Sequence, residues 1–151
     1  MAIPVFKNRS FEYTVENIFT ESLITEFSKS NQIPIKDKIL ADGVLEGEIS
    51  KVDVSVSNTI QGNQESDTSG KLPHDKALAN EYMASVTVNL VLRNQQGKDI
   101  WKTSMTESKR FQAHVQTDNA YILNPLVNES TKRETFKVLA QTMMSKMHDR
   151  F

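Results

Sequence analysis

The residues of this 151-residue chain that could do chemistry are few and scattered. The three histidines, His74, His114 and His148, are far apart in the sequence and lack the close spacing of a metal site. Glu46 and Glu48 would share one face of a strand, and paired carboxylates can do acid–base catalysis, but such a pair more often lies on a solvated strand face. With no cysteine, P-loop or nucleophile motif, the sequence predicts a non-enzymatic protein without metal or cofactor.

Composition and charge narrow the class of protein further. A hydrophobic content of 38% with 25% charged residues is typical of one globular domain with a real core. The formal net charge of −1 argues against nucleic acid as a partner. No apolar run is long enough to span a membrane as a helix. The start, "MAIPVFKN", contains no signal peptide, which fits either a trimmed chain or a cytosolic protein that begins with a strand.

Hydrophobic periodicity predicts four strands and two amphipathic helices in the order β-α-β-β-β-α. Thr14 is the expected N-cap of the first helix. The fold class is therefore α+β: a two-layer sandwich in which two helices cover one face of a four-stranded, mainly antiparallel sheet. The strands are expected at 2–6, 41–58, 82–93 and 100–112, the helices at 14–30 and 130–151, and a long flexible hairpin loop at 58–80.

The long strand at 41–58 contains an irregularity. Its apolar residues fall on odd positions before Ser50 and on even positions after Lys51. A strand has a side-chain period of two, so a change of parity requires an extra residue. We expect a β-bulge near Ser50–Lys51; the alternative is a strand buried on both faces at one end.

The turn between the last two strands fixes their register. If Gln96 and Gly97 form the centre of the turn, Leu92 faces Trp101 and every inward apolar residue meets another. The only tryptophan is then a core residue rather than a binding aromatic. The opposite face is rich in hydroxyl groups and carries Arg93, Lys102 and Arg110. That face is either plain solvated surface or a surface for an anionic or polar partner.

Several segments in this order resemble the LptE family of lipopolysaccharide-assembly lipoproteins. They are "AIPVFKNRSFE", an amphipathic helix, "ADGVLEGEI", "EYMASVTVNLVLRNQQGKDIWK", "ESKRFQ" and a closing helix. The resemblance implies a single LptE-like domain over residues 1–151. It also implies a lipoprotein at the periplasmic face of the Gram-negative outer membrane, anchored through an upstream lipidated cysteine that this chain does not contain.

The same resemblance implies partners. Members of the family sit inside the large outer-membrane β-barrel LptD, plug it, help it assemble and contact lipopolysaccharide. Arginine and lysine are the residues that recognise phosphate groups of such a lipid. The candidate contacts are Arg93, Lys102 and Arg110 on the open face, Lys98 at the turn and Lys71 in the loop.

Two other classes stay open at this point. One is another envelope lipoprotein with a similar small α+β domain, such as an activator of peptidoglycan synthases or a secretion-channel subunit. The other is a cytosolic binding module.

Overall fold

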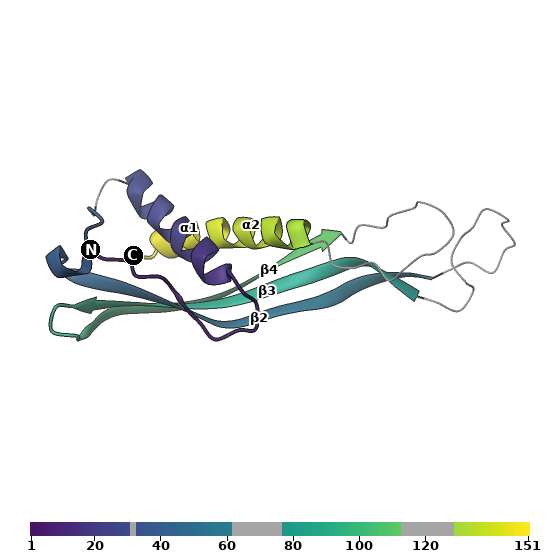
Figure 1. The fold of residues 1–151 in the computed structure, drawn as a ribbon, viewed down its shortest axis with the longest axis horizontal. Helices are drawn as coiled ribbons and strands as arrows, with labels where there is room; N and C mark the ends of the chain where they lie inside the picture. Colours follow the sequence, from purple (N-terminus) through teal and green to yellow (C-terminus); the bar gives the residue numbers. More distant parts are fainter. Residues whose placement is uncertain (31–32, 62–76, 113–128) are drawn as a thin grey trace, which may run out of the picture.

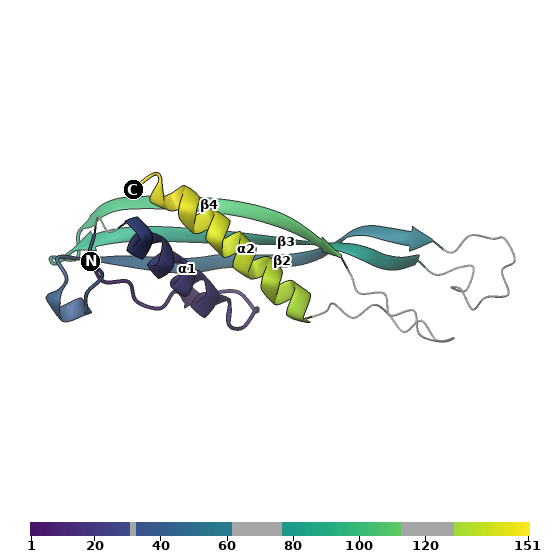
Figure 2. The ribbon, with the colours of Figure 1, turned by 90° about the horizontal axis from the view of Figure 1, so that it is seen from above.

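The protein is a two-layer α+β domain. The computed structural model describes residues 1–30, 33–61, 77–112 and 129–151. One sheet has the strand order β1-β2-β3-β4, in which β1 is parallel to β2 and the other neighbours are antiparallel. Both long helices lie on the same face of this sheet (Figures 1 and 2), as the sequence predicts. The elements are β1 (Lys7–Asn8), α1 (Val15–Ser30), the short 3-10 helix η1 (Lys38–Leu40), β2 (Gly43–Gln61), β3 (Ala77–Asn94), β4 (Asp99–Gln112) and α2 (Glu129–His148).

The core fills the space between the helices and the sheet. Apolar stripes at spacings of three and four bury Phe19, Leu23 and Phe27 of α1 and Phe136 and Met143 of α2, all at most 2% exposed. The sheet supplies alternate residues to the same core. These are Leu45 and Ile49 of β2, Ala84, Val86, Val88 and Leu90 of β3, and Met105 and Phe111 of β4.

The bulge expected in β2 is confirmed. Ile49 pairs with Val88 and Lys51 pairs with Thr87, which leaves Ser50 as the extra residue. The Ser50 hydroxyl donates to the carbonyl oxygen of Thr87 at 3.3 Å. Apolar residues on both sides of the bulge can therefore face the helices.

The predicted register of β3 and β4 is confirmed over most of its length. Leu92 lies opposite Trp101, and Tyr82 lies opposite Phe111, whose ring it stacks on at 5.7 Å. Trp101 is half-buried and meets the ring of Phe151 edge-on at 5.1 Å. The tryptophan therefore belongs to the rim of the core.

The turn itself differs from the expected two-residue turn centred on Gln96 and Gly97. The Gly97 N–H donates to Asn94, and the Asn94 N–H donates to Lys98, so the loop has three residues, 95–97. Gly97 has a φ of 78°, as this turn requires. The pairing of Arg93 with Asp99 leaves Ile100 as an extra residue, and this second bulge restores the predicted register.

The predicted extent of the loop, 58–80, is wrong at both ends. Residues 58–61 pair with residues 77–81, so both strands continue into a two-stranded extension that we call the arm (58–61 and 77–80). Backbone hydrogen bonds between strands do not require alternating apolar side chains, so the hydrophobic pattern did not predict these strand ends. The arm runs past the helices (Figure 1). Residues 62–76 lie outside the described part of the chain.

The first strand is also displaced from the expected position at 2–6. Ala2 forms an isolated bridge to Val44, and the regular pairing of β1 begins only at Lys7. Pro4, between them, has no N–H to donate to a ladder. Phe6 turns into the core instead and lies against Gly47 of β2, at 3% exposure.

One buried hydroxyl ties this segment to α1. The Phe6 N–H donates to Thr20 Oγ1 at 3.0 Å, and that hydroxyl donates to the Glu16 carbonyl at 2.6 Å. We expect Thr20→Val, which keeps the shape but leaves the Phe6 N–H unpaired, to lower the free energy of unfolding by about 1–3 kcal/mol. Urea unfolding measures this loss, and Thr20→Ser, which keeps the hydroxyl, is the control. Equal stability of Thr20→Val and wild type would show that the bond contributes nothing.

Two details at the helix layer differ from expectation. Thr14 precedes α1, but its φ of 69° is a strained value for a β-branched residue and not that of an N-cap. Glu107 and Lys109 fall on the apolar parity of β4, where the sequence pattern predicts residues that face the helices. Glu107 forms an ion pair with Lys146 of α2, which accounts for its position on that face.

Candidate functional site: the open face of the sheet

The face of the sheet opposite the helices is uncovered, and we call it the open face. Its residues alternate with the buried ones and are half-buried or exposed. Thr87 and Thr106 lie opposite each other there, with hydroxyl oxygens 2.9 Å apart. The open face comprises Glu46, Glu48, Lys51 and Asp53 of β2, Ser85, Thr87, Asn89, Val91 and Arg93 of β3, and Lys102, Ser104, Thr106, Ser108 and Arg110 of β4.

Arg93 lies on the open face but is held by two carboxylates. Its Nη1 is 2.6 Å from Glu46 and its Nε is 2.8 Å from Asp99. The hydrogen bond to Asp99, together with the charges of Glu46 and Asp99, raises the pKa of Arg93 above its ordinary value. The guanidinium therefore links β2 to the turn end of the β3–β4 hairpin. Because two carboxylates neutralise its charge, Arg93 attracts an anionic partner only weakly.

The other predicted cations differ in how free they are. Lys102 is exposed on the open face, and Lys98 is exposed at the turn on the same end of β4; neither forms an ion pair with another described residue. Arg110, at the other end of β4, is 3.7 Å from Glu81. Lys71 lies outside the described residues. The structure thus brings Lys98 and Lys102 into one region and separates them from Arg110.

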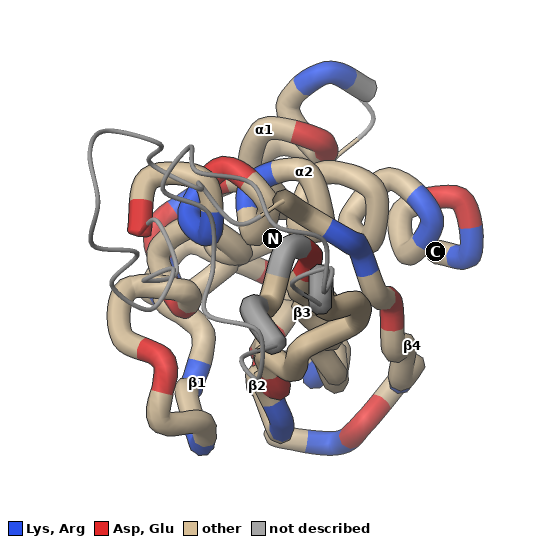
Figure 3. Tube along the Cα trace, turned by 90° about the vertical axis from the view of Figure 1, so that its right-hand side faces the viewer, with Lys and Arg blue, Asp and Glu red and all other residues tan. Residues whose placement is uncertain are grey.

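In the view of Figure 3, basic and acidic residues are interleaved along the described trace. Within the described ranges there is no cluster of histidine and carboxylate side chains suited to a metal ion. None of the described helices is long and apolar enough to cross a bilayer.

A lysine that the sequence did not single out joins two parts of the helix layer. Lys132 of α2 is 2.7 Å from Glu12, in the segment before α1, and 2.9 Å from Glu129. Burial disfavours its charged form, but the hydrogen bonds and charges of the two glutamates outweigh this, so the pKa of Lys132 is raised above 10.5.

This raised pKa predicts a pH dependence of stability. Protonated Lys132 is favoured in the folded state, so its contribution is complete below pH 10.5 and is lost as the pH rises through the higher folded value. The difference in free energy of unfolding between wild type and Lys132→Met should therefore be constant up to about pH 10 and shrink above it. Urea titrations across this range measure it, and a difference that grows with pH would contradict the assignment.

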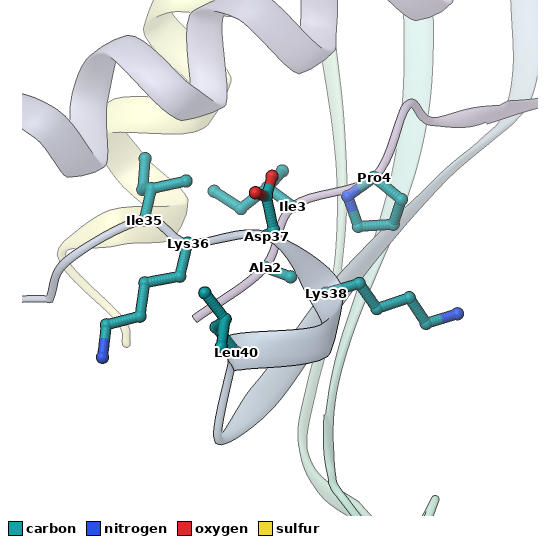
Figure 4. Close-up of a pocket in the computed structure, with 8 residues that line it drawn as sticks. All are labelled: Ala2, Ile3, Pro4, Ile35, Lys36, Asp37, Lys38 and Leu40. Carbon is teal, nitrogen blue, oxygen red and sulfur yellow. The ribbon is translucent and has the colours of Figure 1, made fainter.

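Sequence reasoning also missed a second surface, at the end of the molecule where η1 lies. Leu40 borders a hollow of about 530 Å³ there, lined by Ala2, Ile3, Pro4, Ile35, Lys36, Asp37, Lys38 and Leu40 (Figure 4). The signal available was the mixture of aliphatic and lysine residues in "IPIKDKIL", which has neither a helical nor a strand period.

These features define the class of protein: an elongated two-layer α+β domain with a polar, uncovered sheet face and a two-stranded arm. The particular family follows from the sequence. The chain belongs to the LptE family, whose model, described as lipopolysaccharide-assembly, matches residues 1–150. Among the classes that the sequence left open, this match favours the lipopolysaccharide-assembly lipoprotein.

Solved structures share this fold. A putative lipoprotein from Caulobacter crescentus is 12% identical with a TM-score of 0.50, and the match covers 95% of this chain and 84% of that one. The PelC dodecamer from Paraburkholderia phytofirmans is 12% identical with a TM-score of 0.54, covering 96% and 81%. At these identities the likeness concerns the fold alone. A search of curated proteins finds no match.

Proposed function

We propose that this protein is a non-enzymatic outer-membrane lipoprotein of lipopolysaccharide transport. In this role it plugs the LptD barrel, helps it assemble and contacts lipopolysaccharide during insertion. Membership of the LptE family carries the proposal. The proposal includes a location at the periplasmic face of the outer membrane, with an anchor at a lipidated cysteine upstream of residue 1.

The shape and polarity of the domain support a place inside a barrel. The interior of a large transmembrane barrel is polar, so a plug needs polar outer surfaces. The open face meets that need with hydroxyl, amide and balanced charged groups. The 18 residues of β3 extend over about 60 Å, roughly twice the thickness of a bilayer's hydrocarbon core. A domain of this length can run through a barrel lumen from one side of the membrane to the other.

The free cations support a contact with lipid phosphate. Lys98 and Lys102 have exposed side chains without a carboxylate partner among the described residues, whereas Arg93 is engaged by Glu46 and Asp99. We therefore assign phosphate contact first to Lys98 and Lys102, with Arg110 as a weaker contributor, and a positioning role to Arg93.

Co-purification tests the barrel partner. Full-length tagged protein, with its own N-terminal segment, is isolated from solubilised outer membranes of its host, and its partners are identified by mass spectrometry. We expect a large outer-membrane β-barrel in near-equal amount. A preparation that contains no barrel, or one that contains peptidoglycan synthases or secretion-channel components instead, would overturn the proposal.

Binding to lipopolysaccharide tests the assignment of the cations. We expect Lys98→Asp/Lys102→Asp to weaken binding of the purified domain about tenfold or more, because each reversal adds repulsion to the lost attraction. Arg93→Gln should weaken binding less, since its charge is already engaged. Lys29→Asp/Lys137→Asp on the two helices, which changes the net charge by the same amount, is the control. If the control weakened binding as much as the double variant, the open face would not be the site.

A further inference from the structure

One end of the molecule exposes three large aliphatic side chains. Ile39 and Leu40 of η1 are 94% and 69% exposed, and Ile100 of β4 is 62% exposed. In Figures 1 and 2, η1 and the turn between β3 and β4 lie at the same end of the sheet. We call these three residues the apolar tip.

The fold brings these residues together through paired backbone. Two residues separate the end of η1 from β2, and the first residue of β2, Gly43, pairs with Asn94 at the hairpin turn. Gln95 Nε2 also donates to the carbonyl oxygen of Ala41 at 3.4 Å. Ile100 belongs to the apolar tip because it is the extra residue of the β4 bulge and is exposed beside the hairpin turn.

Lysines surround the apolar tip. Lys36, Lys38 and Lys98 are exposed, and none forms an ion pair with another described residue. Figure 4 shows Lys36 and Lys38 extending away on opposite sides, while the Asp37 carboxylate lies toward the hollow beside Ile3. Asp37 and Asp42 are the exposed acids nearby, and Asp99 is held by Arg93. Among the described residues, the three lysine ammonium groups therefore outnumber the two carboxylates that are free at this end.

This combination matches one kind of partner. Exposed aliphatic side chains gain free energy by entering an apolar phase, and unpaired lysines gain it beside anionic head groups. Exposure to water would solvate the lysines but leave the aliphatic side chains without apolar contacts. An apolar groove on a protein would bury the aliphatic side chains but would need acidic groups to pair with three ammonium groups.

We propose that the apolar tip docks on the surface of an anionic phospholipid bilayer. Ile39, Leu40 and Ile100 enter the boundary between head groups and acyl chains, and the three lysines contact lipid phosphates. This site lies at the end opposite the arm (Figure 1) and does not depend on the proposed barrel partner.

Vesicle co-sedimentation tests the inference with the purified 151-residue chain, which contains no cysteine that could be lipidated. The vesicles are phosphatidylcholine alone or phosphatidylcholine with 30% phosphatidylglycerol, at ~0.1 M and ~0.5 M salt. We expect binding to the anionic vesicles that is weakened at high salt. Ile39→Ser/Leu40→Ser should reduce this binding about tenfold or more, and Lys36→Gln/Lys38→Gln should reduce it at least about fivefold.

A matched control removes equally exposed apolar surface elsewhere. Phe11 and Tyr13, in the segment before α1, are 99% and 85% exposed, and Phe11→Ser/Tyr13→Ser should leave vesicle binding unchanged. Circular dichroism verifies that each variant is folded. The inference is overturned if wild type binds no vesicles, if it binds lipopolysaccharide micelles but not phospholipid, or if the control loses as much binding as the tip variant. It is also overturned if the tip variant keeps vesicle binding and loses a protein partner instead.

Discussion

Gly47→Ala is expected to lower the free energy of unfolding by about 2–3 kcal/mol, although it adds only one methyl group. A Cβ at this position would lie 2.4 Å from Phe6 Cε1 and Cζ, well inside van der Waals contact. Phe6 is 3% exposed and its N–H is held by Thr20, so neither the ring nor its backbone can move freely. Gly47 thus permits the N-terminal segment to close the edge of the core.

A double-mutant cycle separates this steric effect from other effects of the alanine. Phe6→Leu removes the part of the ring that a methyl group would strike, so Gly47→Ala in the Phe6→Leu background should cost much less than in wild type. Chemical unfolding of the four proteins gives the coupling free energy. Strict additivity of the two changes would contradict the proposed contact.

The sequence could predict this packing only in part. Leu45, Gly47 and Ile49 alternate correctly for a core face, and a glycine within a strand marks close approach by another group. Nothing in the pattern says that Phe6 is that group. Its position depends on Pro4, which interrupts the expected strand at 2–6 and turns Phe6 inward.

The two bulges show the same limit. The bulge at Ser50 could be predicted because buried apolar residues flank it on both sides and their parity changes there. The bulge at Ile100 could not, because it lies beside an exposed turn where no buried residue fixes the parity. Its consequence is an exposed isoleucine that has no partner on β3, whereas the predicted register pairs it with Arg93.

The sequence predicted which residues lie on the open face, but it did not predict which of their charged side chains are engaged in ion pairs. The register of β3 and β4 placed Arg93, Lys102 and Arg110 on the open face, and the structure agrees. The ion pair of Arg93 with Glu46 depends on the register between β2 and β3, which are joined by a long connection. A turn of two or three residues fixes a register from sequence, whereas a long connection does not.

The second large effect is expected at the open face. If this face lies against the wall of a barrel, Asn89→Arg/Ser108→Arg should reduce the co-purified barrel to about a tenth or less, because two bulky charges would enter a contact with no partner for them. Both residues point away from the core, so the free energy of unfolding should change by about 1 kcal/mol at most. Quantitative mass spectrometry of the isolated complex measures the loss.

The control for this variant lies on the helix layer. Gln141 and Thr142 are exposed residues of α2, and Gln141→Arg/Thr142→Arg adds the same charge without touching the sheet. We expect this control to retain most of the barrel. Equal loss in both double variants would mean that added positive charge, and not the position of the open face, causes the effect.

Site-specific photocrosslinking in the cell identifies what touches the open face. A photocrosslinking residue at Thr106, near the centre of β4 and exposed on that face, reports its neighbour without altering the core. If the domain plugs the barrel as proposed, irradiation yields an adduct with the large β-barrel LptD. An adduct with a different envelope protein, or no barrel adduct from a folded and membrane-located variant, would show that the open face does not line a barrel.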